Sequence, residues 1–99
     1  MCGAPIGGTA LEGVDINKEA VIVGRVTHDG ETVAGAFVRL LDSGGEFTAE
    51  VVTDDEGIFR FTARDGQWTV RGLAPGGLTG QSSADVAKGR INQADIALA

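Results

Sequence analysis

The sequence has little of several residue types that particular functions require. It contains one cysteine, one histidine and no tyrosine among 99 residues. A single cysteine cannot form a disulfide within the chain, so a fold held by internal disulfides is excluded. One cysteine and one histidine are also too few for the usual zinc site. No stretch approaches the ~18 apolar residues that a membrane-spanning helix needs.

Basic residues are scarce as well. Eight lysines and arginines face fourteen aspartates and glutamates, which gives a net charge of −6. Nucleic acids and anionic membrane surfaces both select a basic surface, so neither is an expected partner. The opening residues 1–8 contain neither a basic segment nor an apolar segment of the kind that a secretory signal carries. The expected location is therefore the cytoplasm.

The residues that are abundant indicate a β-sheet protein. The apolar share is 42% and there are 16 glycines, which is typical of a globular domain with many tight turns. Segments rich in Val, Ile, Phe and Thr alternate with Gly and Asp clusters, and Asp-Gly pairs favour hairpin turns. Strands are predicted at 20–27, 35–41, 46–53, 58–63, 67–73, 81–87 and 91–98, with a loop over 74–80. No helical periodicity is present.

This pattern predicts an all-β fold, a seven-stranded antiparallel Greek-key sandwich of two sheets. Residues 1–17 are rich in glycine and are predicted to be a flexible N-terminal arm. Residues 18–99 are predicted to form the sandwich domain.

Alternation along the strands predicts which side chains face the core. The four phenylalanines and Trp68 are expected to supply most of its bulk. Residues expected to point inward are Ile22, Val26, Ala36, Val38, Leu40, Phe59, Phe61, Trp68 and Val70. Apolar residues expected to point outward are Val21, Val23, Phe37, Leu41 and Ile58.

Two stretches resemble a known family of domains. Residues 24–40 contain Gly-Arg-Val followed by Gly-Ala-Phe-Val-Arg-Leu, and residues 53–61 read Thr-Asp-Asp-Glu-Gly-Ile-Phe-Arg-Phe. Together they resemble the carboxypeptidase regulatory-like domains over about residues 20–73. The resemblance implies a prealbumin (transthyretin)-like sandwich and specifies no activity.

A second resemblance covers nearly the whole chain. It is carried by the Met-Cys opening, by Gly-Ala-Phe-Val-Arg-Leu-Leu-Asp-Ser at 35–43, by Glu-Phe-Thr-Ala-Glu-Val-Val at 46–52 and by Trp-Thr-Val-Arg at 68–71. These segments resemble a small actinobacterial family of unknown function, described as sulfur metabolism protein SseC. Its genes often lie beside that of a thiosulfate sulfurtransferase. The resemblance implies a link to sulfur transfer and a sulfurtransferase partner, and it implies no catalytic residue.

Cys2 is the candidate sulfur-carrying thiol. Removal of Met1 would leave an N-terminal cysteine whose neighbouring amino group has a pKa near 8, so part of the thiol would ionise at neutral pH. Such a thiol suits a carrier of sulfane sulfur, which it would hold as a persulfide. The alternative is a terminal cysteine without a role.

Four arginines and one phenylalanine form the second candidate. The residues Arg25, Phe37, Arg39, Arg60 and Arg71 are all predicted to point outward from the middle of strands. If their strands share a sheet, they form a face for an anion or a partner. The alternatives are cross-strand pairing with residues such as Glu50, and coverage by the arm. An apolar patch beside arginines is also consistent with a homo-oligomer.

No enzyme, metal or cofactor is predicted. The carboxylates of Asp54, Asp55 and Glu56 share one turn but lack the spacing of a calcium loop. His28 has no nucleophile near it in the sequence that would make a catalytic pair. Two functions stay open: a non-catalytic accessory protein of sulfur transfer, and a protein-binding or homo-oligomeric module with no sulfur role.

Overall fold

The computed structural model describes residues 20–87 and 89–99, and every regular element in those residues is a strand. The strands are β1 (Ala20–His28), β2 (Glu31–Thr32), β3 (Phe37–Leu41), β4 (Phe47–Val52), β5 (Ile58–Ala63), β6 (Gly66–Ala74), β7 (Leu78–Val86), β8 (Ile91–Gln93) and β9 (Ile96–Leu98). Within these residues, no helix is long and apolar enough to cross a membrane. The predicted N-terminal arm, residues 1–17, and the predicted start of the sandwich domain at residue 18 lie outside the described residues.

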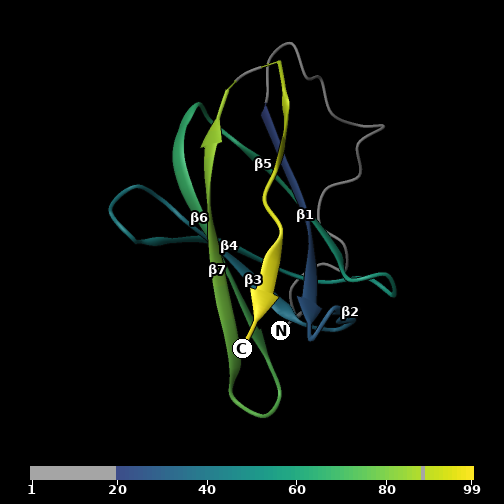
Figure 1. The fold of residues 1–99 in the computed structure, drawn as a ribbon. Coiled ribbons are helices and arrows are strands. Elements are labelled where there is room, and N and C mark those ends of the chain that lie inside the picture. Colours follow the sequence, from purple (N-terminus) through teal and green to yellow (C-terminus); the bar gives the residue numbers. More distant parts are fainter. Residues whose placement is uncertain (1–19, 88) are drawn as a thin grey trace, which may run out of the picture.

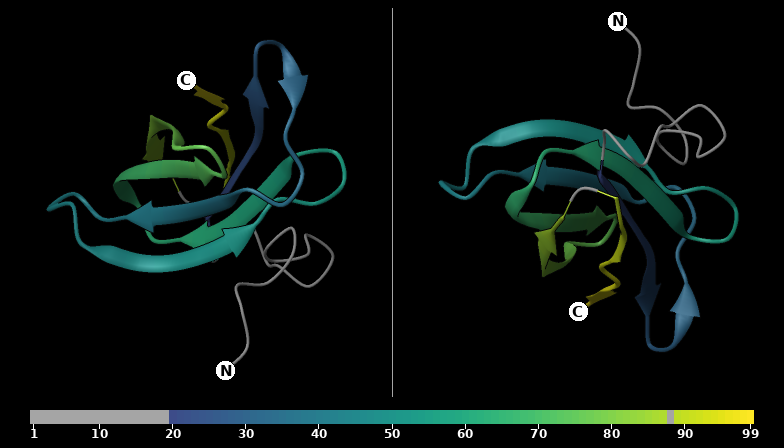
Figure 2. Two further views of the ribbon diagram at one scale, coloured as in Figure 1. Left: turned by 90° about the horizontal axis from the view of Figure 1, so that it is seen from below. Right: turned by 90° about the horizontal axis from the view of Figure 1, so that it is seen from above.

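The strands form two sheets that pack against each other (Figures 1 and 2). One sheet has four antiparallel strands in the order β4-β3-β6-β7. The other has five strands around β1, which pairs with β5 and β2 in antiparallel fashion and with β8 and β9 in parallel fashion. The expected all-β two-sheet sandwich is therefore confirmed.

The C-terminal segment joins the two sheets. Strand β9 lies between β1 and β7 (Figure 1). It pairs with β1 from Val26↔Ile96 to His28↔Leu98. Just beyond β9, the Ala99 N–H donates to the carbonyl of Thr79 in β7 at 2.9 Å. One chain segment is thus hydrogen-bonded to both layers of the sandwich.

The break between β8 and β9 is fixed by hydrogen bonds from both sheets. The Ala94 N–H donates to the Val23 carbonyl at 2.9 Å. The Asp95 carboxylate accepts the Arg25 N–H at 3.0 Å, and the Asp95 carbonyl accepts the Ser82 hydroxyl. A polar residue therefore replaces the ladder bonds that are lost where the strand is interrupted.

Two glycines allow the C-terminal backbone to approach this closely. A Cβ on Gly24 of β1 would collide with the Ala94 carbonyl oxygen and would lie 2.6 Å from the Phe59 ring. A Cβ on Gly80 of β7 would collide with the Ala97 carbonyl oxygen. Each sheet therefore has a residue without a side chain at the point where the C-terminal segment packs against it.

The core confirms the predicted inward faces. All nine residues expected to point inward are at most 8% exposed, and the rings of Phe59 and Phe61 pack at 59° to each other with their centroids 6.0 Å apart. The expectation that all four phenylalanines supply the bulk of the core was wrong, because Phe47 is 60% exposed. Phe37 is 45% exposed, which agrees with its predicted outward direction. Aliphatic residues of both sheets and the C-terminal segment supply its remaining volume, including Ile22, Leu40, Ile96 and Leu98.

Two residues expected to be exposed are buried. Leu41 is 6% exposed although it alternates with Phe37 and Arg39 along β3 and is paired with Thr69 of β6 and Phe47 of β4. Val21 is 1% exposed, and β1 carries a paired strand on each side of it, with Thr62 and Ile91 as its register partners.

The strand count and directions also differ from expectation. Residues 20–87 and 89–99 contain nine strands rather than seven, because β2 is an additional short strand and Ala94 and Asp95 divide the last one. The loop expected at 74–80 is a tight turn, since Gly76 and Gly77 have φ of 87° and 77° and β7 already begins at Leu78. The parallel pairing of β8 and β9 with β1 was not expected.

Thr53 fixes the entry to β3 from the neighbouring turn. It is 2% exposed, its hydroxyl donates to the Val33 carbonyl at 2.7 Å, and the same oxygen accepts the Ala36 N–H at 2.9 Å. The Thr53 N–H in turn donates to the Ala36 carbonyl at 2.9 Å. Ala36 is thereby held inward, so Phe37 must point outward.

Gly24→Ala tests the close approach of the C-terminal segment. We expect it to lower the free energy of unfolding by about 3 kcal/mol or more, because the new methyl group meets backbone that cannot move without breaking β1–β9 pairing. Urea denaturation measures this loss. Gly44→Ala is the control, because its Cβ would lie 3.4 Å from Asp42 Oδ1. Equal urea midpoints for Gly24→Ala and Gly44→Ala would contradict the close approach of the C-terminal segment to Gly24.

Thr53→Val tests the hydroxyl that links Val33 and Ala36. We expect a loss of about 2 kcal/mol in the free energy of unfolding, because the Ala36 N–H is left buried without its acceptor. Thr53→Ser keeps the hydroxyl and should lose about 1 kcal/mol or less. The hydroxyl has no structural role if valine and serine are equally stable in thermal denaturation.

Candidate functional site

The outer face of the four-stranded sheet brings together three of the predicted site residues. Phe37 and Arg39 lie on β3, and Arg71 lies on the adjacent strand β6. All three are exposed. We call this surface the Arg39–Arg71 face; its residues are Phe37, Arg39, Leu41, Phe47, Glu50, Val52, Thr69, Arg71, Leu73, Thr79, Gln81 and Ser83.

A polar row crosses the centre of this face. Its register is Glu50 on β4, Arg39 on β3, Arg71 on β6 and Gln81 on β7. Arg39 Nε donates to Glu50 Oε2 at 2.8 Å. Arg71 Nε and Nη2 donate to Gln81 Oε1 at 3.3 and 3.2 Å. Arg71 therefore pairs with a neutral amide and keeps an uncompensated charge in this row.

The direct opposition of two arginines is unfavourable for the free protein. Arg39 and Arg71 are register partners in neighbouring antiparallel strands. Like charges at such positions repel each other and destabilise the sheet. Glu50 offsets one of the two charges. The arrangement adds nothing to the stability of the sandwich, which favours a role outside folding.

Apolar rows border the polar row on both sides. Val52, Phe37 and Leu73 are aligned across β4, β3 and β6 on one side, and Phe37 is 45% exposed. Leu41 pairs with Phe47 on the other side, and Phe47 is 60% exposed. The sequence reasoning missed Phe47 because the bulge in β4 reverses its expected direction. Exposed aromatic rings beside arginines are typical of the core of protein interfaces.

The other two predicted arginines lie elsewhere. Arg25 is on β1 and Arg60 is on β5, both in the five-stranded sheet, where Arg60 pairs with Val23 and Arg25 pairs with Ile58. The strands that carry the four arginines therefore do not share one sheet, and the four arginines do not form a single face. The five residues thus divide into Phe37, Arg39 and Arg71 on one sheet and Arg25 and Arg60 on the other.

Of the remaining predicted positions, the structure describes His28 and the turn at Asp54. Cys2 lies outside the described residues. Asp54 caps its turn by accepting the N–H groups of Glu56 and Ile58 at 2.9 Å each. His28 Nδ1 is 3.1 Å from the Leu98 carbonyl oxygen, and Nε2 is 3.5 Å from the Asp29 carboxylate. Within residues 20–87 and 89–99, no three His, Cys, Asp or Glu residues are grouped closely enough to hold a metal ion.

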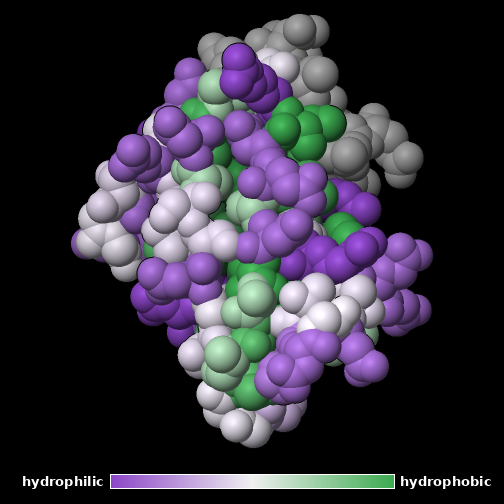
Figure 3. All heavy atoms as spheres, in the orientation of Figure 1, coloured by the Kyte–Doolittle hydropathy of each residue, from purple (hydrophilic) through white to green (hydrophobic). Residues whose placement is uncertain are grey.

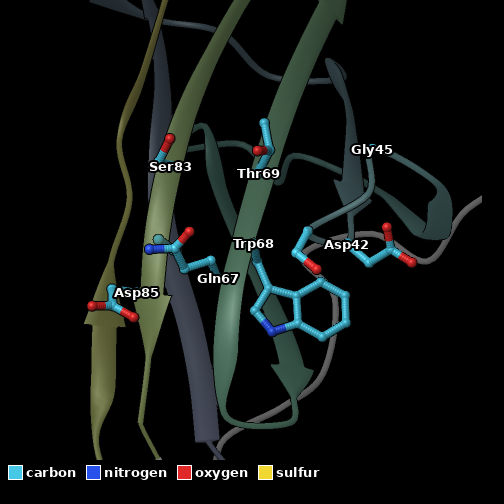
Figure 4. Close-up of a pocket in the computed structure, with 9 residues that line it drawn as sticks. Asp42, Gly45, Gln67, Trp68, Thr69, Ser83 and Asp85 are labelled. Carbon is cyan, nitrogen blue, oxygen red and sulfur yellow. The ribbon is translucent and has the colours of Figure 1, made fainter.

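A hollow of about 310 Å³ lies beside Trp68, at the end of the sheet (Figure 4). The indole points toward the turn that carries Asp42, and its Nε1 donates to the Arg64 carbonyl at 2.9 Å. Asp42 and Asp85 both line the hollow. Their carboxylates disfavour sulfate or thiosulfate there, so the hollow does not supply the anion site that the sequence suggested.

The side of the molecule where β7 and β9 meet offers a different surface. Figure 3 shows that hydrophilic side chains cover most of this side and that apolar atoms appear mainly along a narrow central strip. That strip follows the junction of the two sheets. Among the described surfaces, the Arg39–Arg71 face combines exposed aromatic rings with adjacent guanidinium groups.

Comparisons with known proteins connect the chain to a family. The model of the family described as "Protein of unknown function (DUF1416)" matches residues 2–98. Two proteins of Mycobacterium tuberculosis, both described as uncharacterized, are 48% identical over 98 residues, which is 97% of this chain and 97% of each relative.

Solved structures show likeness of fold alone. A dioxygenase domain from a cellulolytic Streptomyces superimposes with a TM-score of 0.63 at 14% identity, covering 98% of this chain and 89% of that one. A DUF3823 family protein from Parabacteroides merdae gives a TM-score of 0.59 at 15% identity. The match covers 82% of this chain and 46% of that protein. These identities carry no information about activity.

Arg71→Gln tests the repulsion within the polar row. We expect the free energy of unfolding to rise by about 0.5 kcal/mol at low ionic strength and the gain to fade at high salt, because the repulsion is screened. Denaturation in low and high salt measures the difference. Arg25→Gln is the control on the other sheet and should show no such gain. If Arg71→Gln loses stability at low salt, the two charges do not oppose each other.

Proposed function

This chain belongs to the DUF1416 family of proteins of unknown function, and we propose that it is a non-catalytic module that binds another protein through the Arg39–Arg71 face. The observation that carries this proposal is the 45% exposure of Phe37 next to two opposed arginines. Exposed aromatic side chains and arginines contribute most of the binding energy at many protein interfaces.

A rigid platform supports the proposed binding role. Phe37 follows Ala36, which two hydrogen bonds to Thr53 hold in place. Arg71 lies on β6, which is paired on both sides by β3 and β7. A face whose strands are fixed in the free protein loses little conformational entropy on binding. This arrangement favours recognition over catalysis, since it brings no nucleophile and base together.

We further propose that the partner is a protein of sulfur transfer, specifically a thiosulfate sulfurtransferase. The resemblance of segments 35–43, 46–52 and 68–71 to the sulfur metabolism family supports this assignment. Cys2, the single thiol of the sequence, is the proposed carrier group. The sandwich would dock the enzyme while the thiol accepts its sulfur.

The proposed transfer needs no oxidant. The Cys2 thiolate attacks the outer sulfur of a persulfide on the partner's cysteine. A bond forms between that sulfur and Cys2 Sγ, while the bond to the partner's sulfur breaks and its electron pair leaves with the partner's thiolate. Cys2 then holds the persulfide, and a second thiol can accept the sulfur in the same way.

Intact-mass spectrometry tests the carrier role. We expect the protein to gain about 32 Da after incubation with thiosulfate and a sulfurtransferase, because one sulfur atom is added to Cys2. Reductant should reverse the gain, and Cys2→Ser should show none. An unmodified wild-type thiol would remove the carrier role and leave the docking role in place.

Phe37→Ser tests the docking role separately. We expect binding to the same sulfurtransferase, measured by titration calorimetry, to weaken at least about tenfold, because an exposed aromatic anchor is lost. Ile91→Ser is the matched control: Ile91 is 53% exposed but lies on β8 of the other sheet. Equal affinities for the two variants would contradict docking on this face.

A further inference from the structure

We propose that the Arg39–Arg71 face recognises an extended acidic segment of its partner, with one carboxylate bound between Arg39 and Arg71. The inference rests on the proposed binding role and specifies the chemistry of the partner. It starts from the opposition of two guanidinium groups for which the polar row supplies a single carboxylate, that of Glu50, on the side of Arg39 away from Arg71.

The hydrogen bonds of the two arginines leave donors for a ligand. Arg39 uses Nε for Glu50, and Arg71 uses Nε and Nη2 for Gln81. Both Nη nitrogens of Arg39 and Nη1 of Arg71 make no hydrogen bond within the described residues. A carboxylate placed between them would accept charge-assisted hydrogen bonds from both side chains and remove their mutual repulsion.

The neighbours of the bound carboxylate follow from the spacing of the rows. Residues Phe37, Arg39 and Leu41 alternate along β3, so the rows are about 7 Å apart at about 3.4 Å per residue. An extended segment laid along β3 repeats its side chains at the same interval. With its acidic residue over Arg39 and Arg71, a side chain two positions away on one side would contact Phe37. The side chain two positions away on the other side would lie over Leu41 and reach Phe47, the partner of Leu41 on β4. The partner sequence is therefore apolar-x-acidic-x-apolar.

The two apolar rows favour a peptide over a free anion. Sulfate or acetate would engage the arginines but would leave Phe37 and Phe47 exposed. A second copy of this chain is also disfavoured, because a symmetric contact would bring the arginine row of one copy against that of the other. The net charge of −6 of the whole chain disfavours non-specific acidic ligands.

The test uses a synthetic probe, acetyl-Val-Leu-Thr-Asp-Thr-Leu-Val-amide, and a control peptide with asparagine in place of aspartate. Amide NMR spectra of the full-length protein locate the binding and give the dissociation constants. We expect the aspartate peptide to shift the resonances of β3 and β6 and to bind at least about tenfold more tightly than the asparagine peptide.

Variants connect this preference to the arginines. In Arg71→Gln the two peptides should bind equally, and the control Arg25→Gln should retain the full preference. Phe37→Ser should weaken the binding of both peptides by a similar factor, because it removes an apolar contact and leaves the carboxylate site intact. Acetate at the same concentration should produce no shifts on Phe37 or Phe47.

Several results would overturn the inference. Equal binding of the two peptides by the wild type would eliminate the carboxylate site but leave an apolar docking face. No shift of β3 or β6 by either peptide would count against both the inference and docking on this face. Shifts that depend on protein concentration, or binding that appears only when residues 1–17 are removed, would assign the face to a second copy or to the chain's own segment.

Discussion

The close packing of the C-terminal segment against both sheets is the constraint on which the rest of the structure depends. The segment approaches β1 at Gly24 and β7 at Gly80, two positions where a Cβ would collide with its carbonyl oxygens. Hydrogen bonds to Asp95 and Ala99 then connect the segment to both layers. The sandwich is thereby closed along one side by close backbone packing and hydrogen bonds.

This closure leaves the outer side of the four-stranded sheet as a rigid platform. β7 is held by the terminal segment, β6 by β7 and β3, and the start of β3 by Thr53. Buried aliphatic side chains supply the stability, while Phe37, Arg39 and Arg71 point away from the core. That these positions carry an exposed phenylalanine and two opposed arginines is unfavourable for the free protein and consistent with binding. Stability and proposed function therefore belong to opposite sides of the same strands.

Alternation along the strands was sufficient to predict the sandwich, its inner faces and the outward direction of Phe37, Arg39 and Arg71. It failed where local geometry breaks the alternation, as at the bulge in β4 that exposes Phe47, and it did not predict the burial of Leu41. It also gave no strand order, so it could not separate Arg25 and Arg60 from the other arginines or show that Arg39 faces Arg71. The division at Asp95 and the parallel pairing of the terminal strands depend on contacts between residues about 70 positions apart, which no local pattern encodes.

The proposed function requires that the Arg39–Arg71 face contacts a partner in the cell. Photo-crosslinking from position 37 tests it most directly, with benzoylphenylalanine placed there and, as a control, at exposed position 62 of β5. The account predicts one discrete adduct from position 37 that disappears with Arg71→Glu, and none from position 62. Adducts of equal yield from both positions, or an adduct from position 37 that persists in Arg71→Glu, would contradict it.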